Sequence, residues 1–289
     1  MRAFSVCNVD HPNLEVLQHS AAKHGYVLEV LGRDYGKDGT PWSHSAKLVI
    51  LRDRLRHGDP PDSEVFAFVD AFDSCFANSA ALTEAAFRSM DCDLLFSTTT
   101  VCFPRGSRAS CERYPEGSAQ EPPPRRPYLN SGMILGTAGA WRRLFQHYGD
   151  FIHAHGDDQE MMHAIYVDPD RPVTMKLDHD GACLMNLVYF KPRSRPLKVD
   201  AEGKAKNRET KTHPGIVSAP GMHIAKRFRA HHDFLREAHP ELDVDGIAKR
   251  HRAYLRSRRK TLGSKRRRWI YGVLLAAVVL FVLVAESRR

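Results

Sequence analysis

The fold is decided by the stretch Val65-Phe66-Ala67-Phe68-Val69-Asp70-Ala71-Phe72-Asp73. Five apolar residues end at an acid, Asp70, and a second acid, Asp73, follows three positions later. This pattern predicts a buried parallel strand that runs into a carboxylate-bearing turn. Because ligands of open α/β sheets bind outside the carboxyl ends of the strands, both acids are expected at the mouth of a site.

The two carboxylates can serve one ion only if the chain turns directly after Asp70. In a straight strand, Asp70 and Asp73 would point to opposite faces, because the side-chain period is two residues. Paired oxygen ligands suit Mg²⁺ or Mn²⁺, which usually arrive with substrate phosphates. The alternative interpretation is structural: an acidic strand end that caps a helix beginning at Ser74.

The charge of the chain is unevenly distributed. The 289 residues, enough for one large α/β domain or two small ones, carry a formal net charge of +9. Residues 249–268 contain eleven Lys and Arg and no acid, and residues 269–289 carry a net charge of +1, which leaves residues 1–248 with a net charge of −3. This distribution argues against a nucleic-acid groove across the folded part and favours a basic flank that touches anionic lipid.

The cysteines show no metal-binding or disulfide framework. Six cysteines are scattered along the chain without C-x-x-C spacing: Cys7, Cys75, Cys92, Cys102, Cys111 and Cys183. Several of them lie in apolar runs. A reduced cysteine in an apolar run behaves as a small core residue. We therefore expect a reducing compartment in which disulfides are not needed. The first residues are typical of a strand and not of a secretory signal.

Strand-like and helix-like segments alternate along most of the chain. Strands are expected at 3–9, 26–31, 65–70, 93–97, 133–135, 174–178 and 216–222, with helices at 14–24, 46–55, 79–90, 138–155 and ending at 166. Such alternation predicts a parallel sheet wound with helices. Residues 105–127 and 191–214 are polar and are expected to be loops, the first lying over a site.

The C-terminal part has a different character. Residues 269–285 carry no charge and, at about 1.5 Å per residue, are long enough for a short membrane helix. We expect a single transmembrane helix over 269–286, joined to the folded domain by a basic helical linker over 231–268. The stronger positive flank precedes this helix, which predicts a C-terminal anchor with the folded domain facing the cytosol.

Acids and histidines also follow other predicted strands, as a metal-dependent transferase requires: Asp157, Asp158, Asp178, His179 and His223. A divalent ion that bridges a diphosphate stabilises the negative charge on a departing nucleotide. His223 comes after a late strand and could complete the ligand set that Asp70 and Asp73 begin.

Each of these residues also has a structural interpretation. Asp157 and Asp158 could cap the N-terminus of the helix that follows, where acids are favoured. Asp178 and His179 could form a hydrogen-bonded pair, and a lone histidine such as His223 is often structural.

Five motifs occur in the order and approximate spacing of one family: Phe68-Val69-Asp70-Ala71-Phe72-Asp73, Tyr128-Leu129-Asn130-Ser131-Gly132, Asp157-Asp158-Gln159, Leu177-Asp178-His179 and Met222-His223. Over roughly residues 3–230 the chain resembles the glycosyltransferase domain of the procollagen lysyl hydroxylase (PLOD) family. The resemblance implies an α/β domain over 1–230 with a GT-A-like (Rossmann-like) mixed sheet and helices on both faces. It also implies binding of a UDP-sugar with Mn²⁺ (or Mg²⁺) and transfer of glucose to galactosyl-hydroxylysine.

The resemblance also implies roles for individual residues. Asp70, Asp73 and His223 would hold the metal and the UDP diphosphate. Asp157 and Asp158 match the acidic run near the acceptor and the reacting sugar, which makes them the expected catalytic residues. The residues implied for donor binding are Lys47, Trp42, Asp70, Asn130 and Asp178.

The chain departs from the family pattern at several positions. Met133 stands where the family usually repeats glycine, Phe103-Pro104 replaces Trp-Pro, and Ile224-Ala225-Lys226 follows His223 in place of Gly-Asn-Gly. Loss of glycine changes how closely the backbone approaches phosphates or acceptor. Lys226 is a candidate counter-charge for the diphosphate. No hydroxylase domain is present in this chain, so iron and 2-oxoglutarate are not expected.

We therefore expect a membrane-anchored glycosyltransferase that moves glucose or galactose from a UDP-hexose to an acceptor hydroxyl. The acceptor would be a glycan or a hydroxylysine-containing protein, such as galactosyl-hydroxylysine or hydroxylysine of a collagen-like protein; no nucleic-acid partner is expected. One alternative is a catalytically inactive UDP-binding or scaffold member tethered to a membrane. Another is a metal-dependent phosphohydrolase.

Overall fold

The computed structural model describes residues 1–114, 126–154, 156–187, 196–220 and 228–257. The chain divides into two compact units, Met1–Val244 and Asp245–Arg289, and a helix over 244–257 accounts for the described residues of the second. None of the helices in the described ranges is both long and apolar enough to cross a membrane. The transmembrane helix expected over 269–286 lies outside those ranges.

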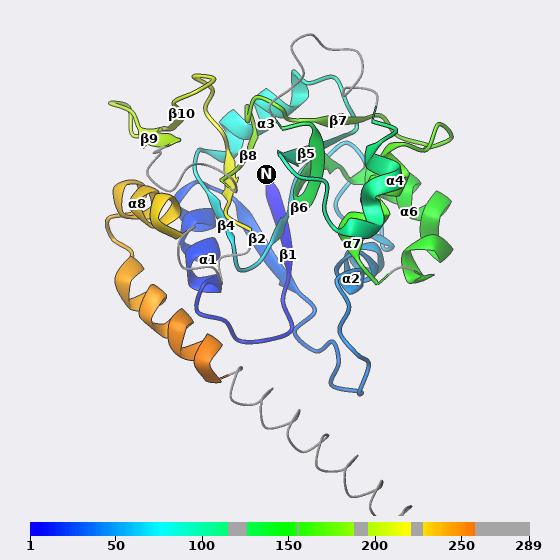
Figure 1. Ribbon diagram of the computed structural model, residues 1–289, viewed down its shortest axis with the longest axis horizontal. Coiled ribbons are helices and arrows are strands. Elements are labelled where there is room, and N and C mark those ends of the chain that lie inside the picture. Colours follow the sequence, from blue (N-terminus) through cyan, green and yellow to red (C-terminus); the bar gives the residue numbers. More distant parts are fainter. Residues whose placement is uncertain (115–125, 155, 188–195, 221–227, 258–289) are drawn as a thin grey trace, which may run out of the picture. The chain divides into compact units, whose positions relative to one another are not determined.

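The centre of the first unit is a six-stranded sheet with the order β2-β1-β3-β6-β5-β7 (Figure 1). Its strands are β1 (Arg2–Val6), β2 (Val27–Leu31), β3 (Val65–Asp70), β5 (Leu94–Thr99), β6 (Tyr128–Thr137) and β7 (Met175–Leu177). Strand β1 is parallel to β2 and β3, and β7 is parallel to β5, but β6 is antiparallel to both its neighbours. The sheet is therefore mixed, as the family resemblance implied, and the all-parallel sheet predicted from alternation alone is wrong.

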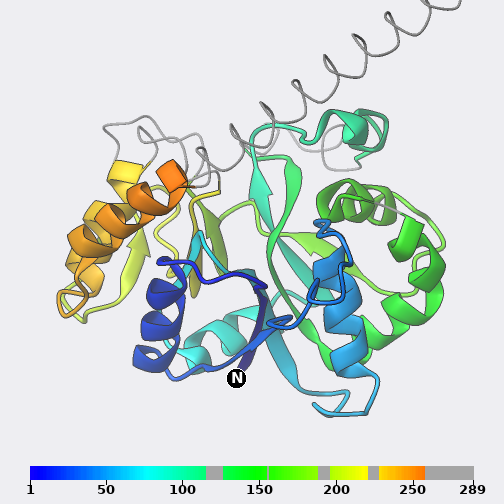
Figure 2. The same cartoon turned by 90° about the horizontal axis from the view of Figure 1, so that it is seen from below.

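Helices cover both faces of this sheet, as Figure 2 shows. On one side lie α1 (Leu14–Lys23) and α3 (Ala80–Arg88), and on the other α2 (Ala46–Leu55), α6 (Ala138–Ala154) and α7 (Asp158–Tyr166). Alternate residues of β3 enter two separate cores: Phe66 and Phe68 pack on the side of α2, whereas Val69 packs on the side of α1. The continuous apolar run of β3 follows from burial of both its faces.

Three short strands form a second sheet with the order β4-β11-β8, made of β4 (Ser74–Phe76), β8 (Leu184–Asn186) and β11 (Ile216–Ser218). Ser74 therefore begins a strand, and the expectation that it starts a helix is wrong; Ser79 caps α3 instead, accepting a hydrogen bond from Leu82 N–H. The predicted loop 191–214 contains the hairpin strands β9 (Leu197–Val199) and β10 (Ala205–Asn207). Strands of three residues are too short to show a period of two.

One further segment is more ordered than the sequence indicates, and another is helical as expected but lies partly within the first unit. Within the predicted loop 105–127, η1 (Arg105–Ser107) and α4 (Arg108–Cys111) form consecutive turns, and Cys111 is joined to Cys102 by a disulfide. This pairing differs from the expectation that all cysteines are reduced. The predicted linker over 231–268 begins inside the first unit, which includes α8 (Phe228–Ala238) and ends at Val244.

Candidate active site

The two acids of the opening motif share one turn. Asp70 is the last residue of β3, and the chain turns directly after it, as a shared site requires. The carbonyl of Asp73 accepts a hydrogen bond from Ala219 N–H at 2.8 Å, which joins the turn to the segment after β11. Asp73 Oδ1 is buried without a hydrogen-bond partner among the described residues. Burial, and then the nearby charge of Asp70, raise the pKa of Asp73 to about 7.

A buried lysine joins Asp70 to the start of α7. Lys47 Nζ on α2 lies 2.6 Å from Asp70 Oδ1 and 3.0 Å from Asp158 Oδ2. Burial acts to lower the pKa of Lys47, but the charges of Asp158 and Asp70 outweigh it and raise the pKa. Lys47 is therefore a charged lysine that holds two carboxylates of the predicted site on different elements.

Strand β6 contributes neighbouring polar residues. Ser131 Oγ donates to Asp158 Oδ2 at 2.9 Å, and Asn130 Nδ2 donates to Gln159 Oε1 at 3.0 Å. Consecutive residues of a regular strand point to opposite faces, but the β5–β6 register shifts between Phe96 and Ser97. This irregularity re-aims the strand, so that both side chains reach the first turn of α7.

A glycine lets β6 pass against the carboxylate of Asp70. A Cβ added to Gly132 would lie 2.9 Å from Asp70 Oδ2 and 3.1 Å from Asn130 Oδ1. The first of these separations is closer than real Cβ contacts allow. Gly132 is therefore required at this position by the close approach of the strand to the site.

The carboxylates of Asp157 and Asp178 make local backbone hydrogen bonds. Asp157 Oδ1 accepts from the N–H groups of Gln159 and Glu160, both at 3.0 Å, and is the N-cap of α7. Asp178 accepts three hydrogen bonds of 2.7–2.8 Å from the backbone N–H groups of residues 182–184. Burial raises the pKa of Asp178, and these bonds partly offset that effect. Asp157 therefore caps α7, as its structural interpretation has it. Asp178 instead binds the backbone of 182–184, and His179 Nδ1 contacts the carbonyl of Arg126, so the hydrogen-bonded pair of Asp178 and His179 is not formed among the described residues.

The loop that carries Trp42 ends beside α7. Trp42 is 38% exposed and its ring packs edge-on against Tyr35, with 5.7 Å between ring centroids. The N–H of His44 donates to the carbonyl of Gly156 at 3.2 Å. Trp42 therefore belongs to a loop anchored next to the site, and its own ring contact is with Tyr35.

Two predicted site residues, His223 and Lys226, lie outside the described residues. The described part of the chain brings Asp70, Asp158 and Lys47 together directly, with Asn130 beside them. Asp70 and Asp73 do not belong to either three-ligand cluster found among the described residues.

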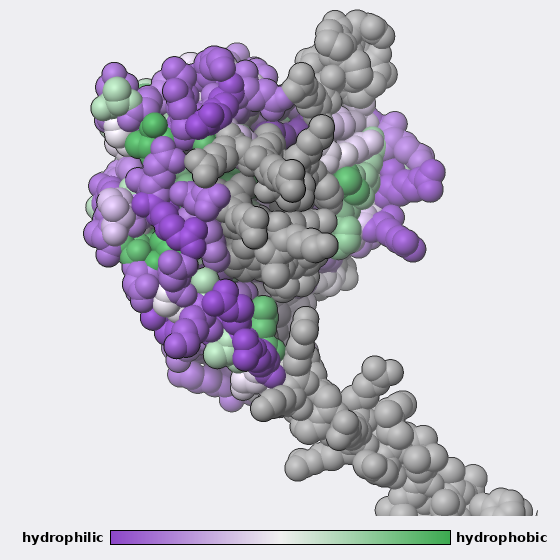
Figure 3. All heavy atoms as spheres, turned by 60° about the vertical axis from the view of Figure 1, so that its left-hand side comes forward, coloured by the Kyte–Doolittle hydropathy of each residue, from purple (hydrophilic) through white to green (hydrophobic). Residues whose placement is uncertain are grey.

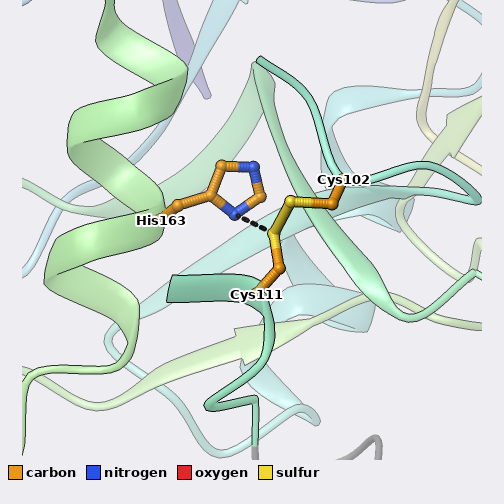
Figure 4. Close-up of side chains that lie close together, drawn as sticks. All are labelled: Cys102, Cys111 and His163. Carbon is orange, nitrogen blue, oxygen red and sulfur yellow. Dashed lines mark hydrogen bonds between the residues drawn. A yellow bond between two sulfur atoms is a disulfide. The ribbon is translucent and has the colours of Figure 1, made fainter. Parts of the chain in front are cut away.

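A disulfide-linked segment is also fastened to α7. Figure 4 shows His163 of α7 beside the Cys102–Cys111 disulfide, with Nδ1 3.6 Å from Cys111 Sγ. His163 Nε2 lies 3.0 Å from the carbonyl of Phe103, which also accepts a hydrogen bond from Gln159 Nε2. Burial lowers the pKa of His163 to about 4, so the ring is neutral at pH 7. These contacts fix the helix that presents Asp158.

The residues present fit a hard divalent cation. Among the described residues, the ammonium group of Lys47 contacts the carboxylates of Asp70 and Asp158, and the charges of Asp70 and Lys47 both act on the nearby carboxylate of Asp73. Carboxylate oxygens are the ligands that Mg²⁺ and Mn²⁺ prefer. Asp73 Oδ1 also lacks a partner in the described part of the molecule. A buried oxygen without a donor is the kind of atom that a metal ion would satisfy.

Sequence reasoning assigned no role to three residues of this site: Ser131, Gly132 and Gln159. All three lie inside motifs that the resemblance uses, so their positions were marked but their contacts were not. A glycine inside a strand is a known sign of a bulge or of close backbone approach, and Gly132 carried that signal. Nothing in the sequence indicated that Gln159 would contact Asn130.

The structure is that of an α/β protein with a cluster of acidic residues at and after the carboxyl end of β3. A family model described as the PLOD GT domain matches residues 1–231. The chain therefore belongs to the PLOD glycosyltransferase-domain family, which confirms the resemblance read from its five motifs.

Solved structures with similar folds include other transferases. A crystal structure of the galactosyltransferase LgtC with donor and acceptor sugar analogues is 14% identical, with a TM-score of 0.47, covering 82% of this chain and 95% of that one. A glycosyltransferase involved in glycosylation of the major capsid of PBCV-1 is 13% identical, with a TM-score of 0.41, covering 78% and 95%. No curated protein matches the chain. The assignment to the family therefore depends on the family model.

Proposed function

We propose that this chain is a metal-dependent hexosyltransferase that moves glucose or galactose from a UDP-sugar to an acceptor hydroxyl. Membership of the PLOD glycosyltransferase-domain family supports the transfer of a sugar. The observation that carries the site is the excess of negative charge in the described residues around Lys47, which contacts the carboxylates of Asp70 and Asp158 and lies near that of Asp73.

In this proposal Asp70 and Asp73, with His223, hold a divalent cation. When bound, the ion supplies positive charge that stabilises the diphosphate of departing UDP. Lys47 fixes the orientation of Asp70, and Gly132 leaves room for that carboxylate beside β6. The unpartnered Asp73 Oδ1 supports its role as a ligand.

The acceptor side of the proposed site is built around Asp158. Lys47 and Ser131 both contact its Oδ2, so the carboxylate is held in one orientation at the start of α7. We assign to Asp158 the stabilisation of the reacting sugar or the orientation of the acceptor hydroxyl. Asp157 supports it by capping the same helix.

The other predicted donor-binding residues stay as proposals. Asn130 is held by Ser97 and Gln159 at the edge of the site, and Trp42 comes from the loop anchored at Gly156. We assign Trp42 to the nucleotide base and Lys226 to the diphosphate. Asp178 is assigned to shaping the pocket, because its carboxylate binds backbone N–H groups.

Family membership also supports a hydroxylysine-type acceptor, either galactosyl-hydroxylysine or hydroxylysine itself in a collagen-like protein. We further propose that residues 269–286 anchor the protein in a membrane, with the transferase domain on the cytosolic side. The uncharged run and the basic residues before it support this orientation.

The test is turnover of a panel of UDP-hexoses, measured as UDP release with and without Mn²⁺ and galactosyl-hydroxylysine peptide. Asp70→Ala and Asp73→Ala are expected to lose metal-dependent release while keeping the circular dichroism of the wild type. Asp34→Ala is the matched control, because Asp34 also pairs with a lysine but is fully exposed. Undiminished turnover in both site variants would contradict the proposal, and UDP binding without release would support the inactive alternative.

A further inference from the structure

A second cluster of ligand-type side chains lies where α1 meets the segment that follows α8. His19 Nε2 on α1 lies 2.8 Å from Glu241 Oε1, and His239 Nδ1 lies 3.9 Å from the same oxygen. One ligand atom from each of these residues falls within 4.8 Å of the others. Figures 1 and 2 show α1 and α8, which precedes His239, side by side in the first unit.

The buried member of this cluster has no hydrogen-bond partner. The side chain of His239 is fully buried, and neither ring nitrogen has a partner in the described part of the molecule. The ring is packed edge-on between His19 and His24, with 5.6 Å between centroids in each pair. An imidazole buried without partners costs free energy that a ligand on its nitrogen would recover.

The cluster is also open to solvent on one side. His19 and Glu241 expose 31% and 43% of their side chains, so an ion can reach the nitrogen and oxygen atoms from water. Figure 3 shows that the described atoms on this side of the molecule are mostly hydrophilic, with small separate hydrophobic areas. A docking surface for an apolar partner would instead show one large, contiguous hydrophobic patch.

We propose that His19, His239 and Glu241 form a binding site for a divalent cation of the zinc class, separate from the candidate active site. Two imidazoles and one carboxylate are a known ligand set for Zn²⁺, with water in the remaining position. The nitrogen ligands distinguish this site from the carboxylate site of Asp70 and Asp73, which suits harder ions. The bound ion joins α1 to the segment after α8.

A lysine side chain lies at the proposed zinc site. Lys23 Nζ lies 2.9 Å from Glu241 Oε1 and 2.6 Å from the carbonyl of Ala238. Its ammonium group neutralises Glu241, and burial is small enough for it to swing into solvent, since 33% of the side chain is exposed. Zn²⁺ therefore competes with Lys23 for the same carboxylate oxygen. This competition gives the proposal a specific signature.

The test is calorimetric titration of the EDTA-stripped full chain with ZnCl₂. Compared with the wild type, His19→Ala and Glu241→Gln are expected to weaken zinc binding at this site by more than about tenfold. Lys23→Met is expected to strengthen it severalfold, because the competing cation is removed. X-ray absorption spectroscopy at the zinc edge is expected to show imidazole nitrogens at Zn–N distances of about 2.0–2.1 Å.

Two controls separate this site from other sources of binding. His213→Ala removes another histidine paired with an acid, Asp200, and is expected to leave zinc binding unchanged. Asp73→Ala removes a proposed ligand of the candidate active site and is expected to leave zinc binding at His19, His239 and Glu241 unchanged, so failure of the proposed transferase site does not affect this result. Zinc binding that is absent in the wild type, or equal in His19→Ala, Glu241→Gln and the wild type, overturns the proposal. Weaker binding by Lys23→Met overturns it as well.

Discussion

At Asp73 the described structure leaves a buried carboxylate oxygen without a donor, close to the charge of Asp70. Burial without a partner costs free energy, and burial together with the charge of Asp70 raises the pKa of Asp73 to about 7, because both disfavour the charged carboxylate. Lys47 contacts both Asp70 and Asp158, but its single positive charge balances only one of the two carboxylates. A negative charge therefore remains in addition to that of Asp73 on the turn after β3.

Gly132 gives the first prediction at this scale. Gly132→Ala would place a Cβ 2.9 Å from Asp70 Oδ2, so the carboxylate or the strand must move. We expect metal-dependent UDP release to fall by about tenfold or more, since small displacements at a site are costly. Gly149→Ala is the control, because a Cβ there meets no atom within 4 Å. Equal activity of the Gly132→Ala variant and the wild type would show that β6 does not constrain the site.

His163 gives a prediction about pH. Its pKa is about 4 in the folded protein and near 6.5 when unfolded, so the unfolded state binds the proton more readily. Neutral, buried His163 therefore contributes to the free energy of unfolding above pH 6.5. This contribution is lost as the pH falls toward 4, by about 3 kcal/mol at most. Denaturant unfolding at pH 7 and pH 4.5 is expected to show a smaller drop in His163→Gln than in the wild type. An identical drop would mean that His163 is solvated in the native state.

Among elements, β6 and α7 build most of the site. The register shift in the β5–β6 ladder turns Asn130 and Ser131 toward α7, and the N-cap Asp157 fixes where that helix begins. The capping residue was readable from the sequence because acids at a helix N-terminus are a local signal. The register shift was not, because it depends on pairing with β5, which is distant in sequence.

The Cys102–Cys111 disulfide supports α7 from the side of η1 and α4. A crosslink over a separation of nine residues is expected to add about 2–3 kcal/mol to the free energy of unfolding. Cys102→Ser should lower the denaturation midpoint accordingly, and a reductant should lower that of the wild type to a similar value. Cys92→Ser is the control, since Cys92 is a free thiol. No effect of reductant would show that the pair is reduced in solution.

At the scale of the whole molecule, local sequence signals predicted where helices and strands lie better than they predicted how the strands pair. Most helices and the strands around β3 lie close to their expected ranges, because apolar periodicity reports burial directly. The direction of β6 could not be read from periodicity, and only the family resemblance implied a mixed sheet. The hairpin of β9 and β10 was missed because each strand has three residues. The same limit applied to the site: the resemblance marked Asp70, Asp158 and Lys47, but the ion pairs by which Lys47 joins the two acids are tertiary contacts that it did not imply.

The proposed anchor gives a prediction for the whole chain. A chain that ends at residue 257 lacks the uncharged run and much of the basic stretch, but keeps all of the family domain at 1–231. We expect the full chain to float with anionic liposomes in a density gradient and the shortened chain to remain at the bottom. Both are expected to release UDP equally in detergent. Flotation of the shortened chain would place the membrane contact elsewhere.

The most direct test of the site is calorimetric titration of the full chain with UDP, in the presence and absence of Mn²⁺. If a divalent cation on Asp70 and Asp73 completes the charge balance around Lys47, UDP binding requires the metal in the wild type and is lost in Asp73→Asn. The Asp34→Asn control is expected to bind like the wild type. UDP binding of equal strength with and without Mn²⁺, or unchanged in Asp73→Asn, would contradict the account.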